Sequence, residues 1–193
     1  MRNLTVAISP RAGERTTMNN GPREIRDALG KFIQQGESLY ALLDAAQSSE
    51  IPYRLKFTKT EHDSLYRGRS EEALWYVAPY LAVCEPDSDF VEWVLTHGWG
   101  NSWAVFLTSG ADLESLRKHF RQFLLVKAED DRDYYFRFYD PRVLRVFLPT
   151  CDLTEAREFF GPVSRFLMEG ETSEALLSFA ASEQGTSQEA VLL

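Results

Sequence analysis

The side chains that most often bind metal ions or act as nucleophiles are few and widely spaced in this chain of 193 residues. None of the histidines His62, His97 and His119 is part of an HExxH pattern, in which two ligands share one helix face. Cys84 and Cys151 are too far apart in sequence to form a CxxC pair. The spacing predicts no metal site, and two cysteines in apolar surroundings are expected to be buried free thiols.

Patterns typical of nucleotide-binding and hydrolytic enzymes are incomplete. The Gly-Trp-Gly run at 98–100 lacks the later glycine, lysine and Ser/Thr of a phosphate-binding loop, so a tight turn is the better interpretation. No serine lies in a GxSxG sequence. Adjacent acids such as Asp130 and Asp131 lie in polar runs typical of solvated surface. We predict that the protein is not an enzyme and has no catalytic residue and no cofactor; a hydrolase with an unrecognised site is the alternative.

The segment YYFRFYDPR, at 134–142, alternates aromatic and basic residues. Alternate residues of a strand share a face, so the pattern predicts a strand at 134–139 with Phe136 and Phe138 on one side. Pro141 has no N–H to give to a sheet and is expected to end the strand. The segment lacks the glycines of RNA-recognition strands, so we predict no nucleic-acid binding.

On the other side of this expected strand lie Arg137 and Tyr139. The guanidinium of Arg137 forms a planar fork that suits a carboxylate, and either Asp140 or Asp44 is the expected partner. The local sequence thus predicts an aromatic strand held by an ion pair, but it gives no reaction.

Strand and helix patterns interleave along the chain, which predicts an α/β (α+β) fold with a single mixed β-sheet flanked by helices. Strands are expected at 39–43, 54–57, 79–83, 103–108, 124–128, 134–139 and 142–148, the fifth and sixth forming a hairpin. Helices are expected at 22–33, 88–97, 112–121 and 152–160.

Composition divides the chain into three parts. Residues 1–21 are expected to be a flexible arm, 22–168 a single domain, and 169–193 an acidic tail with a short helix. The 21 basic and 29 acidic residues give a net charge of −8, which does not favour binding to nucleic-acid phosphates. No apolar run approaches the about 20 residues that span a bilayer, so no membrane partner and a cytoplasmic location are expected.

An ordered set of segments resembles a known family. They are LYALLDAA (39–46), SLYRG (64–68), APYLAV (78–83), HGWGNSWAVFLTS (97–109), LRKHFRQFLLV (116–126), YYFRFYDPRVLRVFLP (134–149) and EFFGPVSRF (158–166). Together, over about 38–168, they resemble the domain-of-unknown-function family 4123, the adaptor or chaperone proteins of bacterial type VI secretion. The resemblance implies an adaptor that binds a cognate toxic effector and helps to load it onto a VgrG-type spike protein. A generic intracellular protein-binding module is the alternative.

The resemblance also implies roles for individual residues. Those expected to shape the fold are Asp44, Pro79, Tyr80, Trp99, Phe136, Phe138, Asp140 and Pro141. The residues expected on the partner-binding face are Arg137, Tyr139 and Arg142. A cation or a phenol that faces outward is best explained by contact with a partner. The acidic segment 172–182 is expected to be a secondary contact.

Overall fold

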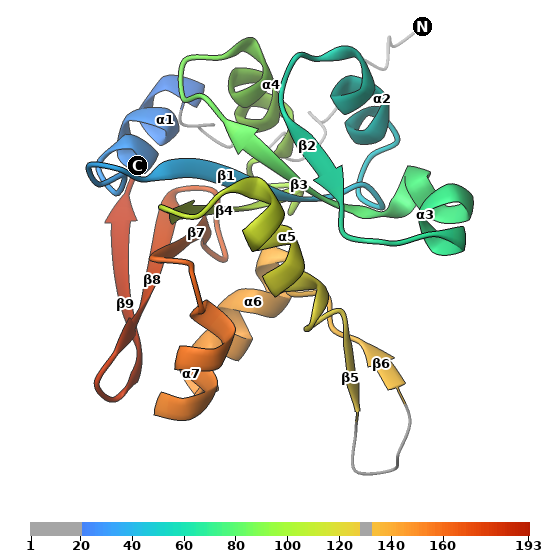
Figure 1. The fold of residues 1–193 in the computed structure, drawn as a ribbon. Helices are drawn as coiled ribbons and strands as arrows, with labels where there is room; N and C mark the ends of the chain where they lie inside the picture. Colours follow the sequence, from blue (N-terminus) through green and yellow to red (C-terminus); the bar gives the residue numbers. More distant parts are fainter. Residues whose placement is uncertain (1–20, 128–132) are drawn as a thin grey trace, which may run out of the picture.

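The computed structural model describes residues 21–127 and 133–193, and it has three layers. A seven-stranded sheet with the strand order β2-β3-β1-β4-β7-β8-β9 lies between two sets of helices (Figure 1). Its strands are β1 (Ser38–Asp44), β2 (His62–Ser64), β3 (Pro79–Cys84), β4 (Ala104–Ser109), β7 (Arg165–Glu169), β8 (Ala175–Ser182) and β9 (Gly185–Leu192). The remaining strands, β5 (Leu125–Lys127) and β6 (Asp133–Tyr135), form a separate hairpin.

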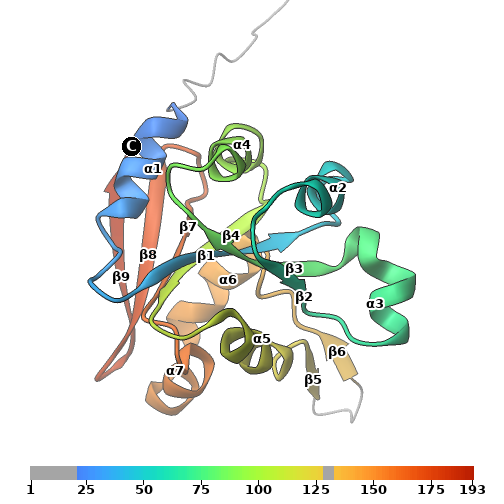
Figure 2. The same ribbon diagram turned by 45° about the horizontal axis from the view of Figure 1, so that its top comes forward.

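Helices cover both faces of the large sheet, as the tilted view also shows (Figure 2). On one side lie α1 (Pro22–Gly30), α2 (Glu50–Phe57) and α4 (Asp89–Gly98). On the other lie α5 (Leu113–Arg121), α6 (Pro141–Phe147) and α7 (Leu153–Phe160). The short helix α3 (Arg69–Leu74) and the 3-10 turns η1 (Trp75–Val77) and η2 (Leu148–Thr150) complete the described elements.

Strand β1 shows why the sheet needs two helical layers. Leu39 and Leu43 point into the core that contains α1, α2 and α4, whereas Tyr40 and Leu42 point into the opposite core. Both sets of side chains are buried, so the strand is apolar from Leu39 to Leu43 instead of alternating. The predicted strands 39–43, 79–83 and 103–108 are confirmed as β1, β3 and β4.

Polar side chains begin the helices that were predicted from capping residues. Ser88 accepts a hydrogen bond from the backbone of Val91, and Asp112 accepts one from Ser115. Asp152 begins α7 with a reciprocal capping box, because the Glu155 carboxylate accepts from the Asp152 backbone in return. The predicted helices 88–97, 112–121 and 152–160 are confirmed as α4, α5 and α7.

The prediction of a strand at 134–139 is wrong beyond its first residues. The hairpin exists, but β6 ends at Tyr135 and pairs only with β5, outside the large sheet. Phe138 turns inward instead, is fully buried, and stacks on Phe120 with ring centroids 5.5 Å apart. Burial of a whole aromatic side chain is worth about 2–3 kcal/mol, which outweighs continued pairing in an isolated two-stranded ribbon.

The strand predicted at 142–148 is the helix α6. Asp140 is its N-cap, and Pro141 occupies the first turn, where a missing N–H costs nothing. Leu144 and Leu148 then follow at helical spacing and are buried. The possible strand at 54–57 is likewise the end of the helix α2.

The short helix expected in the tail 169–193 is replaced by β8 and β9, which extend the large sheet through β7. Leu176 and Phe179 point to opposite cores, an alternation that suits a strand. The α+β class is confirmed, but the sheet is not mixed, since every pairing in it is antiparallel. The arm expected at 1–21 lies outside the described residues except for Gly21.

Candidate functional site

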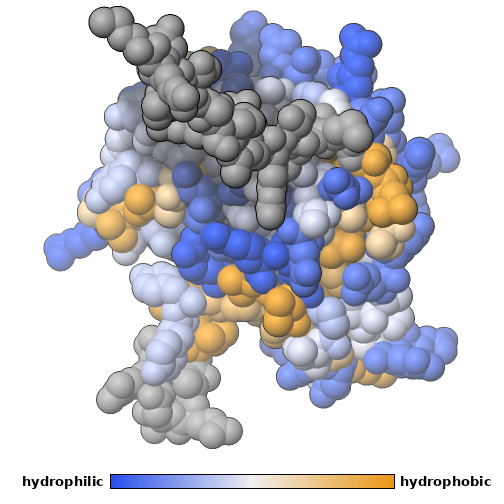
Figure 3. Space-filling model, turned by 180° about the vertical axis from the view of Figure 1, so that it is seen from behind, coloured by the Kyte–Doolittle hydropathy of each residue, from blue (hydrophilic) through white to orange (hydrophobic). Residues whose placement is uncertain are grey.

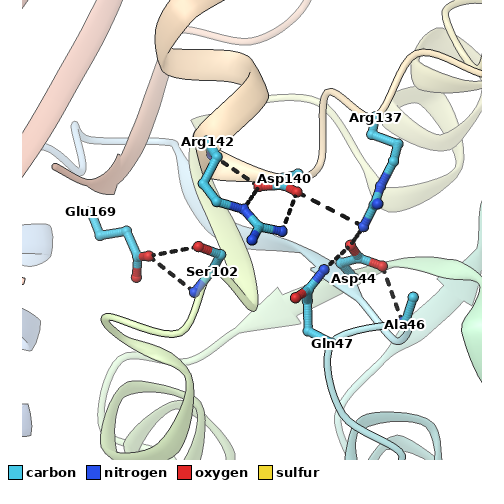
Figure 4. Close-up of polar contacts among 8 residues, drawn as sticks. All are labelled: Asp44, Ala46, Gln47, Ser102, Arg137, Asp140, Arg142 and Glu169. Carbon is cyan, nitrogen blue, oxygen red and sulfur yellow. Dashed lines mark hydrogen bonds and ion pairs between the residues drawn. The ribbon is translucent and has the colours of Figure 1, made fainter. Parts of the chain in front are cut away.

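A cluster of four charged side chains joins the end of β1 to the start of α6 (Figure 4). We call Asp44, Arg137, Asp140 and Arg142 the ion cluster. Asp44 ends β1, and its side chain is 1% exposed. Its carboxylate accepts hydrogen bonds from the Ala46 backbone (3.1 Å) and from Gln47 Nε2 (2.9 Å). These contacts fix the chain as it leaves the sheet.

Asp140 forms the second centre of the ion cluster. Arg142 binds it with both arms of its guanidinium, through Nε at 2.9 Å and Nη2 at 2.7 Å. The backbone N–H of Arg142 also donates to Asp140, as an N-cap requires. The pKa of Arg142 is raised, first by its hydrogen bonds to Asp140 and then by the charge of that carboxylate.

Arg137 bridges the two carboxylates. Its Nη2 forms an ion pair with Asp44 and lies 3.8 Å from Asp140 Oδ2. Burial by itself would lower the pKa of Arg137, but the hydrogen bond and charge of Asp44 outweigh it and raise the pKa. The predicted pairing of Arg137 with Asp140 or Asp44 is confirmed, and the structure brings it to both, with Asp44 the nearer.

The phenol of Tyr139 was expected to face outward, but it does not. It is 4% exposed and packs in the core against Phe138, so the outward placement is wrong. Burial is also the first cause of its strongly raised pKa, so the phenol stays protonated. Arg137 and Arg142 do reach the surface, with side chains that are 42% and 51% exposed.

The other residues of the matched motifs have structural contacts. Pro79 begins β3, and the Tyr80 hydroxyl donates to the Trp75 carbonyl at 2.8 Å. The indole of Trp99 donates to the Ser173 carbonyl at 2.8 Å, which ties the 98–100 turn to the loop before β8. These contacts agree with fold-shaping roles.

Sequence reasoning missed Glu169, a buried carboxylate at the end of β7. It accepts hydrogen bonds from the backbone and the hydroxyl of Ser102 (Figure 4). The backbone of Gly100 also donates to it. Burial raises its pKa, although these donors act in the opposite direction. No local pattern around Glu169 points to this contact, because its partners are distant in sequence.

An apolar hollow of about 330 Å³ lies beside the hairpin. It is lined by Phe123, Val126, Phe136, Phe147, Glu155, Glu158 and Phe159. Phe136 and Phe147 meet with ring centroids 4.7 Å apart, and Phe159 forms the floor, 5.2 Å from Phe147. The sequence places Phe123 and Phe159 on apolar helix stripes but does not reveal that they border an opening.

Hydrophobic side chains are visible on the surface seen from behind. They lie in several separate groups, at both sides of that face and below a central band of hydrophilic side chains (Figure 3). The exposed apolar residues of the hairpin and α6 include Leu125, Val126 and Val146. Of these residues, Val126 also lines the apolar hollow.

Metal-binding groups are not gathered anywhere in the described parts of the chain. Across 21–127 and 133–193, no three His, Cys, Asp or Glu side chains are placed to hold a metal ion. Cys84 and Cys151 are buried and unpaired, and burial raises the pKa of both thiols, to about 11 for Cys151. No helix of the described chain has the length and apolar character needed to cross a bilayer.

Replacing Arg142 by alanine is expected to lower the free energy of unfolding by about 1–3 kcal/mol, the usual worth of hydrogen bonds to a charged group. The carboxylate of Asp140 is buried and loses its two-armed partner. Urea denaturation measures the loss. Arg142→Lys should recover only part of it, because an ammonium lacks the planar fork; full recovery would show that charge alone matters.

Comparison with known proteins identifies one family. The family model described as "Domain of unknown function (DUF4123)" matches residues 39–158, more than half of the chain. No curated protein and no solved structure matches this sequence. The matched range includes the whole ion cluster and most of the residues that line the apolar hollow. This chain therefore belongs to the DUF4123 family.

Proposed function

We propose that this protein is a cytoplasmic adaptor of type VI secretion, which binds a cognate toxic effector and promotes its loading onto the spike protein. The proposal starts from membership in the DUF4123 family and from the function that the sequence resemblance implies. The adaptor acts by binding alone and catalyses no reaction.

The observation that carries the proposal is the apolar hollow. Phe123, Phe136 and Phe147 are only half-buried, and Val126 is 39% exposed. Apolar side chains open to water are costly unless a partner covers them, and aromatic residues are enriched at the centres of protein interfaces. The hollow is therefore suited to a protein partner.

The ion cluster fixes two of the segments that line this surface. Arg137 and Asp140 fix the loop that presents Phe136 and begin the helix that presents Phe147. A surface that is already ordered loses less conformational entropy on binding. The exposed parts of Arg137 and Arg142 and the segment 172–182 are proposed as additional contacts.

Deleting the gene in cells with an active type VI apparatus tests this function. We expect export of one toxic effector to be lost, while export of the structural tube protein continues. Affinity purification of the tagged chain should recover the same effector together with the spike protein. Unchanged export of every effector would reject the adaptor role and favour a generic binding module.

A further inference from the structure

Two carboxylates stand at the rim of the apolar hollow. Glu155 and Glu158 are exposed residues of α7 and line the opening together with the phenylalanines. They are three positions apart, so they share a helix face and repel each other. Among the described side chains, those of 21–126 and 134–193, Glu158 forms no ion pair, and the Glu155 carboxylate accepts a hydrogen bond from the Asp152 backbone. A cation beside this rim would relieve the repulsion.

The floor of the hollow is suited to one large apolar side chain. Phe159 is buried at its base and meets Phe123 with ring centroids 5.1 Å apart. The ring centroids of Phe136 and Phe159 are 6.0 Å apart. These rings hold one another in place, so the opening of about 330 Å³ is preformed. Its lining is apolar, while the charges are confined to one rim.

We propose that the apolar hollow binds a segment of the effector that carries one large apolar side chain flanked by lysine or arginine. The apolar side chain enters the space between the phenylalanines, and the flanking cation faces Glu155 and Glu158. This inference rests on the proposed adaptor function, and it specifies the chemistry of the segment. Complementary charge at the rim then selects against acidic segments.

The test uses two fluorescent amphipathic peptides with the same leucine stripe, one carrying lysines and the other glutamates beside it. Fluorescence anisotropy measures their binding to the full-length protein at low ionic strength. The lysine peptide should bind more tightly than the glutamate peptide. Glu158→Lys should lower the affinity for the lysine peptide by about fivefold, because one attractive rim contact becomes repulsive. The same variant should raise the affinity for the glutamate peptide.

A matched variant distinguishes the effect of charge at the rim from the effect of the protein's net charge. Glu92→Lys changes the net charge equally but lies on α4, across the sheet from the hollow. It should leave both affinities unchanged. Glu158→Lys should fold normally, because a cation in the last turn of α7 interacts favourably with the helix dipole. Thermal melts should therefore show an unchanged or slightly raised midpoint.

Other outcomes would overturn the inference. Equal weakening by Glu92→Lys and Glu158→Lys would show non-specific attraction to an acidic protein. Concentration-dependent dimerisation that Glu158→Lys abolishes would assign the hollow to a second copy of this chain. If the effector still co-purifies undiminished with Glu158→Lys and with Val126→Asp, the adaptor function stands but its binding site lies elsewhere.

Discussion

Replacing Arg137 by alanine is expected to lower the free energy of unfolding by about 3 kcal/mol, or the thermal midpoint by roughly 6–12 °C. The reason is the carboxylate left behind. Asp44 is almost fully buried, and the guanidinium is its only cationic partner among the described residues. A buried charge without its partner costs more than the pair contributes. Differential scanning calorimetry of the wild type and the variant measures the effect.

The opposite deletion provides the control. Asp44→Asn removes the buried charge but keeps a side-chain oxygen that can accept from the Ala46 backbone, and it leaves a partly exposed guanidinium, which water can solvate. It should therefore cost less than Arg137→Ala. The double variant should then be more stable than Arg137→Ala alone, because the orphaned carboxylate is gone. Equal losses for the two single variants would show that Asp44 does not depend on this cation.

Gly185→Ala is the second change with a large expected effect, a loss of about 3 kcal/mol or more. Gly185 begins β9 with a φ of 112°, a conformation that side chains rarely adopt. A Cβ there would also collide with the backbone carbonyl of Cys151. Since neither part can move cheaply, the β8–β9 hairpin should separate from the turn before α7. Urea denaturation and hydrogen exchange of β9 amides measure the result.

Substitutions at two other glycines distinguish the two causes of the expected loss, conformational strain and steric collision. Gly36 also has a positive φ, of 86°, but open space lies around it, so Gly36→Ala should cost about 1 kcal/mol. Gly30 has open space and helical surroundings, so alanine there should be neutral or stabilising. A Gly185→Ala loss no larger than that of Gly36→Ala would rule out the collision.

Sequence patterns predicted the central strands and most helices because their signals are local. Apolar runs such as 39–43 and capping residues such as Asp112 and Asp152 act within a few positions. The pairing of Arg137 with Asp44 was also predictable, since a guanidinium on an apolar segment needs a carboxylate. The class of the fold follows from these elements.

The errors occurred where two local signals competed. Aromatic alternation at 134–139 favours a strand, yet Phe138 and Tyr139 are buried by contacts with distant helices. Asp140 and Pro141 form a helix start that the alternating pattern obscured. For the tail, the segment Leu176–Phe179 suits either period, and only pairing with β7 decides it. The apolar hollow needs four separate segments, so no single stretch reveals it.

The order of strands in the large sheet has a consequence for synthesis of the protein. Strand β4 pairs with β7, and the helices α5, α6 and α7 lie between these strands in the chain. Ribosomes therefore release those helices before the strands β7 and β8 that carry Phe166 and Phe179 into the same core. Until β7 and β8 have been synthesised, the sheet that covers the apolar faces of these helices is incomplete. Folding of this half must wait for long-range pairing, which is slow and leaves the nascent chain open to aggregation.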